Sequence, residues 1–192
     1  MSPTAAEHLD HIAAVTARDR LIIAQARGEE VAMQHTGDKL GALRDAAHAL
    51  DATRTPYALI GGVAVGIHSG APRATADVDL AVDSRADRAA ILEAFTAHGF
   101  RLVGQFAHSI NFRHGSGEPV QLAVDPAFDA MIERAEPIDL GTASVPLVAR
   151  GDLIAMKERA AADPERRKSK RLRDQADVEL LRGDVPDPDE GW

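Results

Sequence analysis

Two glycines followed by two closely spaced aspartates constrain the fold of this chain more than any other feature. Gly61 and Gly62 lie in YALIGGVAVGIHSG, and Asp77 and Asp79 lie in TADVDLAV. This order indicates a strand, a glycine turn, a short helix and a second strand. Side chains two residues apart on a strand share a face, so we expect both carboxylates on one side of the second strand. The pattern predicts an α/β (α+β) fold with a mixed sheet flanked by helices.

The two carboxylates and the glycine turn together predict a metal and phosphate site. Carboxylates this close repel each other unless a cation lies between them, and such hard oxygen ligands suit Mg²⁺. The free amides and the dipole at a helix start favour an anion beside Gly61 and Gly62. Taken singly, a glycine pair also makes an ordinary tight turn, and two aspartates also make a charged strand edge.

Hydrophobic alternation and turn residues predict the remaining elements. From residue 57 onward, strands are expected over 57–60, 76–82, 101–105, 109–113 and 119–124. A helix is expected over 85–98 with Asp83 or Ser84 as its cap, and a short helix after Pro126. A strand or two should follow in 137–150, and then two helices, capped by Asp152 and by Asp163.

The organisation of the chain follows from these elements. We expect an N-terminal helical extension over 1–55, an α/β core over 56–150, C-terminal helices over 151–183 and an acidic tail over 184–192. Helical spacing in the first fifty residues predicts two or three helices, broken near Gly28 and at 36–38, with the best defined one over 39–50.

Composition excludes several classes of function. The net charge of −8 argues against a protein that coats nucleic acid through an overall basic surface. The chain has no cysteine, which excludes a disulfide framework, thiolate catalysis and cysteine-bound zinc. The N-terminal residues lack an uninterrupted apolar run of the length that a signal peptide or membrane span needs. We therefore expect a cytoplasmic protein without a membrane partner.

The order of four motifs resembles the minimal nucleotidyltransferases of the DNA polymerase beta superfamily. The motifs are GGVAVGIHSG, RATADVDLAV, EPVQLAVDPAF and DLIAMKERAAADPERRKSKRLRDQADVELL, and the resemblance covers residues 56–182. Within the superfamily, the chain is most similar to the group of AbiEii-type toxins and their uncharacterised relatives. The resemblance implies Mg²⁺-dependent transfer of a nucleoside monophosphate from an NTP to a hydroxyl, with Asp77 and Asp79 as metal ligands.

The chain departs from the superfamily at a third carboxylate on a neighbouring strand. Gln121 best matches that position, and an amide is a weaker Mg²⁺ ligand than a carboxylate. Asp125 shares its strand face but lies about 13 Å further along, and Glu118 would need a kink to reach the site. Two outcomes stay open: one-metal chemistry with Gln121 as an outer contact, or a site that binds nucleotide without catalysis.

The C-terminal helices are expected to complete the site. Toxin-like members rely on a lysine and an aspartate there, and Lys157 and Asp174 match those positions, so the resemblance implies catalytic roles for both. The helical wheel turns Asp174 and Asp177 inward. Alternatives are a surface lysine with its head group in water and a structural pair between Lys170 and Asp174.

Several basic residues are candidates for phosphate contacts. Arg73 and Thr75, just before the acidic strand, contact the nucleotide or shape the loop. His68, after the glycine turn, is a weaker candidate. A basic run either binds phosphates of an RNA acceptor or forms a solvated face: Arg166, Arg167, Lys168, Lys170, Arg171 and Arg173.

The expected partners follow from the resemblance. They are an NTP, an RNA end (tRNA above all) as acceptor, and an antitoxin protein. A protein side chain or an antibiotic is the alternative acceptor, and a nucleotide-binding or interaction module without catalysis is the alternative function.

Overall fold

The structure, a computed structural model, describes residues 4–28 and 38–185. Within these residues the chain forms one seven-stranded mixed sheet with the strand order β3-β4-β5-β2-β1-β7-β6. The strands are β1 Tyr57–Ile60, β2 Val78–Val82, β3 Phe100–Gln105, β4 Ser109–His114, β5 Pro119–Val124, β6 Glu136–Asp139 and β7 Ser144–Leu147. The expected mixed sheet flanked by helices is confirmed.

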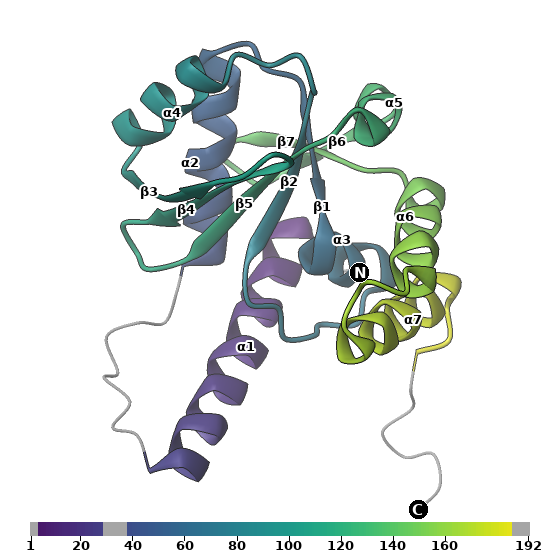
Figure 1. Cartoon of the computed structure of the whole chain (residues 1–192). Coiled ribbons are helices and arrows are strands. Elements are labelled where there is room, and N and C mark those ends of the chain that lie inside the picture. The colour runs from purple at the N-terminus through teal and green to yellow at the C-terminus, as the bar shows by residue number, and fades with distance from the viewer. Residues whose placement is uncertain (1–3, 29–37, 186–192) are drawn as a thin grey trace, which may run out of the picture.

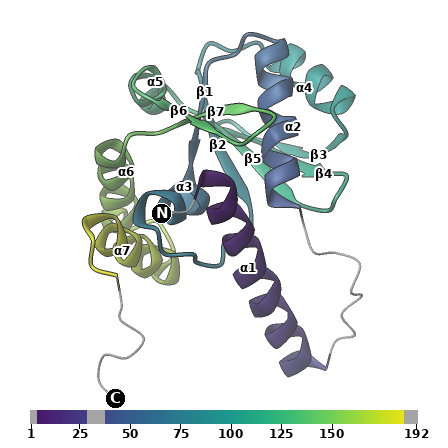
Figure 2. The same ribbon diagram turned by 180° about the vertical axis from the view of Figure 1, so that it is seen from behind.

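Helices lie on both faces of the sheet (Figures 1 and 2). Figure 1 shows α2 and α4 on one side of the sheet, and α3, α5, α6 and α7 on the opposite side. The helices are α1 Ala5–Arg27, α2 Lys39–Ala52, α3 Gly61–Ser69, α4 Arg88–Ala97, the short 3₁₀ helix η1 Pro126–Phe128, α5 Asp129–Glu133, α6 Arg150–Ala162 and α7 Lys168–Arg182. None of the helices in the described ranges is both long and apolar enough to cross a membrane.

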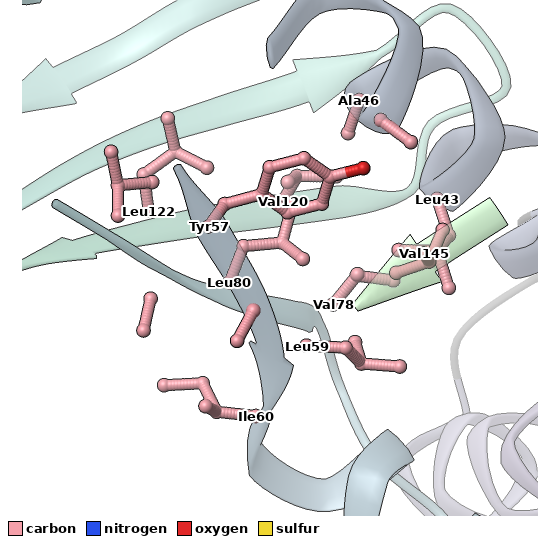
Figure 3. Packing of buried hydrophobic residues seen from close by; sticks show 14 of the residues in the cluster. Leu43, Ala46, Tyr57, Leu59, Ile60, Val78, Leu80, Val120, Leu122 and Val145 are labelled. Atoms are coloured by element: carbon pink, nitrogen blue, oxygen red, sulfur yellow. The ribbon is translucent and has the colours of Figure 1, made fainter. Parts of the chain in front are cut away.

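The main core lies between α2 and the central strands (Figure 3). Leu43 of α2 lies beside Val145 of β7 and belongs to the same buried cluster as Leu59 and Leu80 of the central strands; all four side chains are fully buried. Alternation places Val120 and Leu122 of β5 on this same face of the sheet. The opposite face therefore carries the intervening, more polar residues of the same strands, and the candidate site is built there.

The predicted N-terminal helices are present in the described ranges. α1 ends at Gly28, which adopts a left-handed conformation with φ 66°. Asp38 caps α2 by accepting a hydrogen bond from the Gly41 amide at 2.7 Å. The breaks expected near Gly28 and at Asp38 are confirmed, whereas Thr36 and Gly37 lie outside the described residues.

Helix starts were predicted less well than strands. α4 begins at Arg88 and is capped by Asp87, because Asp83 instead binds Arg85 and Ser84 donates to Asp129.

The starts of both C-terminal helices were also predicted wrongly. α6 begins at Arg150, so Asp152 lies inside its first turn and pairs with Arg134. α7 begins at Lys168 because Asp163 ends α6 and its side chain accepts from the Glu165 amide.

Candidate active site

Most of the site residues predicted from separate parts of the sequence line one cavity of about 370 Å³, whereas Gly61, Asp125 and Asp177 do not line it. Asp77, Asp79 and Gln121 form its sheet side, and Lys157 and Asp174 come from α6 and α7. The remaining wall includes Gly62, Arg73, Thr75, Arg166, Lys170 and Arg173. The cavity therefore joins the strand carboxylates to the C-terminal helices.

Asp79 is held against the glycine turn. In the sheet register, Asp79 lies beside Ile60 of β1 and beside Gln121 of β5. Gly61 has a φ of 71°, and a Cβ atom there would lie 2.0 Å from Oδ2 of Asp79. Only glycine fits both the backbone conformation and the space. The turn thus brings the start of α3 into contact with the Asp79 carboxylate.

The start of α3 is suited to an anion. α3 has nine residues, and no side chain caps its first turn. Uncapped amides and the helix dipole favour a phosphate at such a terminus. A Cβ atom on Gly62 would lie 2.5 Å from Thr75 Oγ1 and 3.1 Å from an Arg73 guanidinium nitrogen, so both side chains sit directly against this turn.

The negative charge of Asp77 acts on the carboxyl group of Asp79. Burial of the Asp79 carboxyl group, and after it the charge of Asp77, raises the pKa of Asp79 to about 7. Lys157 opposes this shift. Asp77 itself lies in a bend just before β2, one residue outside the strand in which it was expected. A cation between the two carboxylates would remove their repulsion.

The oxygen donors of the cavity fit Mg²⁺. This ion is typically held by one or two carboxylates, with water and substrate phosphates completing an octahedral shell. No group of three or more His, Asp or Glu side chains within residues 4–28 and 38–185 could form a closed metal cage. Asp77 and Asp79, with the Gln121 amide beside them, match an open magnesium site.

Lys157 is the centre of a buried ion-pair network. Its Nζ lies 3.0 Å from Asp174 Oδ1 and 2.8 Å from Asp177 Oδ2. Arg166 pairs with Asp174 and Arg73 pairs with Asp177, each at 2.8 Å. Lys157 is 8% exposed, so its head group is not in open water. Asp174 and Asp177 face inward as expected, and Asp174 pairs with Lys157 and Arg166 in place of Lys170.

The two other carboxylates considered for the third metal ligand have structural partners. Asp125 caps η1 by accepting from the Ala127 amide, and it lies 3.3 Å from His108. Glu118 is buried and forms an ion pair with Lys39 of α2. Neither lines the cavity. Gln121 alone occupies the position beside Asp79 on β5.

The basic run divides into two groups. Arg166, Lys170 and Arg173 line the cavity, whereas Arg167, Lys168 and Arg171 do not. His68 also lies outside the cavity wall: its Nε2 donates to the Val148 carbonyl at 2.7 Å, and burial lowers its pKa. This hydrogen bond gives His68 a structural role.

No functional role was predicted for α1, yet α1 supports the loop before Asp77. Thr16 accepts a hydrogen bond from the Thr75 amide at 3.2 Å and donates to the Ile12 carbonyl at 2.7 Å. Arg20 donates to the Ala76 carbonyl at 3.1 Å. The only available signal was a threonine at helical spacing from buried apolar residues, which does not reveal its partner.

Solved structures with a similar fold include a nucleotidyltransferase-like protein. An antigenic nucleotidyltransferase-like protein from Paracoccidioides brasiliensis is 25% identical with a TM-score of 0.51, over 75% of this chain and 75% of that chain. ANT(2")-Ia, solved with adenylyl-2"-tobramycin, is 17% identical with a TM-score of 0.55, over 77% and 89%. JHP933 from Helicobacter pylori is 16% identical with a TM-score of 0.51, over 79% and 67%.

Sequence comparison gives the family. No curated protein matches the chain significantly. The sequence model described as "Nucleotidyl transferase AbiEii toxin, Type IV TA system" matches residues 42–190, which include every residue of the cavity wall. With the nucleotidyltransferase fold, this match confirms the resemblance and shows an enzyme of the nucleotidyltransferase class. The chain therefore belongs to the AbiEii nucleotidyl transferase toxin family.

Proposed function

We propose that this protein transfers a nucleoside monophosphate from an NTP to the hydroxyl of an RNA end, most directly that of a tRNA, as the toxin of a toxin–antitoxin pair. The observation that carries the proposal is the cavity in which Asp77 and Asp79 lie beside the uncapped start of α3. The family match supports the toxin role and an antitoxin partner.

Asp77 and Asp79 are the proposed Mg²⁺ ligands. When bound, Mg²⁺ neutralises charge on the phosphoryl oxygens and aligns the nucleophile with the leaving group. The uncapped amides at the start of α3 are the proposed phosphate contacts, and Arg73 and Thr75 lie against Gly62 at the same turn. Gln121, which is neutral, serves as an outer contact beside Asp79.

The cations of the opposite wall are the proposed triphosphate contacts. Lys157 acts as a point charge there, held in place by Asp174 and Asp177. Lys170 and Arg173 are exposed and line the same wall. The six cations of the basic run lie in a chain whose net charge is −8, so this positive region is local. It can attract the phosphates of NTP and RNA without making the whole surface basic.

One specific observation favours a second candidate function. Gln121 stands beside Asp79 where a third carboxylate was expected, and a site with only two carboxylates can bind Mg²⁺ and nucleotide without turnover. A nucleotide-binding module would show NTP affinity that requires Mg²⁺ but would release no pyrophosphate.

The destination of the nucleotide tests the proposal. The protein is incubated with each α-labelled NTP, Mg²⁺, and total cellular RNA or protein. We expect label on RNA, and none with Asp77→Asn. Asp125→Asn, which changes a carboxylate outside the cavity, is the matched control and should label RNA as wild type does. Label on polypeptide in place of RNA would refute the acceptor, and no transfer at all would favour the binding module.

A further inference from the structure

The face of the sheet that carries Asp79 continues toward the edge strand as a row of half-buried residues. Asp79 is paired in register with Gln121 of β5, Gln121 with Asn111 of β4, and Asn111 with Gly104 of β3. Paired residues share a face, and it is the face opposite α2. Asn111 Oδ1 is buried without a hydrogen-bond partner in the described part of the chain. A polar path thus leads from the cavity to the edge strand.

Two arginines lie side by side on the same face. Arg101 of β3 is paired directly with Arg113 of β4, and both side chains are exposed. Neither forms an ion pair within the described residues, and Arg113 donates only to the Gly117 carbonyl at 3.0 Å. Like charges directly opposite each other on a sheet are destabilising. An anion between the two guanidinium groups would remove that repulsion.

An exposed aromatic ring completes the surface. Phe106 is 59% exposed. A Cβ atom on Gly104 would lie 3.1 Å from the Phe106 ring, so the ring covers Gly104 on the face that Asn111 shares. Arg88 of α4 donates to the Phe106 carbonyl at 3.0 Å, and the Phe106 amide donates to Ser109 at 2.8 Å. The backbone that carries the ring is therefore fixed.

We infer that Arg101, Phe106, Asn111 and Arg113, named here the sheet platform, bind the single-stranded segment of the RNA acceptor that precedes its reacting hydroxyl. Cationic side chains beside an exposed aromatic ring are typical of surfaces that bind single-stranded nucleic acid. Adjacent strands are about 4.8 Å apart, which places β4 and β3 about 10 and 14 Å from β2. The inference rests on the proposed function, because it assigns an acceptor to the same cavity.

The geometry separates the two substrates. The triphosphate contacts proposed above lie on α3, α6 and α7, whereas the sheet platform lies across Gln121 from Asp79. An acidic polypeptide could also pair with Arg101 and Arg113. The uncovered ring of Phe106 beside them favours RNA, because a base stacks on it whatever the sequence.

The test measures RNA binding without NTP. A 5′-labelled single-stranded RNA oligonucleotide is titrated with the full chain, and affinity is followed by fluorescence anisotropy between about 50 and 200 mM salt. Neutralising two phosphate contacts in Arg101→Gln/Arg113→Gln should make the slope of log affinity against log salt shallower by about 1.4. Phe106→Ala should weaken binding about tenfold.

Matched variants control for folding and for general charge. Arg159→Gln changes an exposed arginine of α6 outside the cavity, and Val103→Ala changes an exposed apolar residue of β3. Both should bind RNA as wild type does. Mg²⁺-dependent NTP affinity should be unchanged in every variant, and the melting temperature of Arg101→Gln/Arg113→Gln should not fall, because this change removes two like charges that face each other. NTP affinity that falls together with RNA affinity would overturn the separation of the two sites.

The outcomes distinguish this inference from the proposed reaction. If the platform variants lose affinity for RNA but no NTP labels RNA, the sheet platform binds RNA and the proposed reaction is wrong. If wild type labels RNA and the platform variants bind and label RNA equally well, the proposed reaction is supported and RNA binding by the sheet platform is refuted. Absence of RNA binding by wild type overturns the inference. So does a titration with an acidic polypeptide in which the platform variants lose affinity for the polypeptide but keep their affinity for RNA.

Discussion

Replacement of Lys157 by methionine tests the buried network on which the C-terminal half of the site depends. The change removes the only cation that contacts both Asp174 and Asp177 within the described residues. Breaking a buried ion pair from one side costs about 3–5 kcal/mol. Each aspartate keeps one arginine at 2.8 Å, so we expect the lower limit, about 3 kcal/mol. For a chain of this size, that corresponds to a fall in melting temperature of about 6–12 °C.

Thermal unfolding followed by circular dichroism measures this fall. Lys170→Met is the matched control, because Lys170 lines the same cavity but is exposed and forms no ion pair within the described residues. Its melting temperature should stay close to that of wild type, although its affinity for NTP should decrease. If Lys157→Met has the melting temperature of wild type, or if the melting temperatures of both variants fall equally, the network does not hold the two helices together. Either result would refute our reasoning.

Three further changes examine the sheet side of the site. Gln121→Asp places a carboxylate beside Asp79 and should tighten Mg²⁺ binding several-fold by calorimetry; unchanged affinity would show that this position does not face the metal. Thr16→Val leaves the Thr75 amide without its acceptor and should lower stability by about 1–3 kcal/mol and weaken Mg²⁺ binding; an unaltered denaturation midpoint would contradict this. Because burial and Asp77 raise the pKa of Asp79 to about 7, protonated Asp79 stabilises the metal-free fold below pH about 4, and this contribution is lost as the pH rises through 7. With a chelator present, the free energy of unfolding of wild type should therefore fall relative to that of Asp79→Asn as the pH rises from about 4 to about 7. A difference between the two proteins that stays constant with pH would contradict the raised pKa of Asp79.

Short-range sequence patterns predicted the strands and the carboxylates of the site. β1 and β5 have the expected bounds, because alternation and turn residues are local properties of the sequence. Asp79 and Gly61 were placed on adjacent elements by their order alone. Helical spacing also turned Asp174 and Asp177 inward, since their burial follows from the neighbouring apolar residues of α7.

Helix starts and long-range partners required tertiary information. Asp152 and Asp163 have the residue type of caps, but their side chains are used by Arg134 and by the Glu165 amide. The contact between Thr16 and Thr75 joins residues far apart in the chain, and no local pattern encodes it. One signal was overlooked: Thr4 and Glu7 have the spacing of a capping box, and they form one at the start of α1.

The rate of Mg²⁺-dependent pyrophosphate release is the most direct test of a metal site at Asp77 and Asp79. Wild type, Asp79→Asn and the control Asp125→Asn are compared with NTP and RNA present and with Mg²⁺ titrated. We predict that Asp79→Asn lowers the rate by about 100-fold or more, because a bound metal supplies several kcal/mol of transition-state stabilisation. Asp125→Asn should react as wild type does. Equal rates and equal Mg²⁺ dependence in wild type and Asp79→Asn would contradict the account.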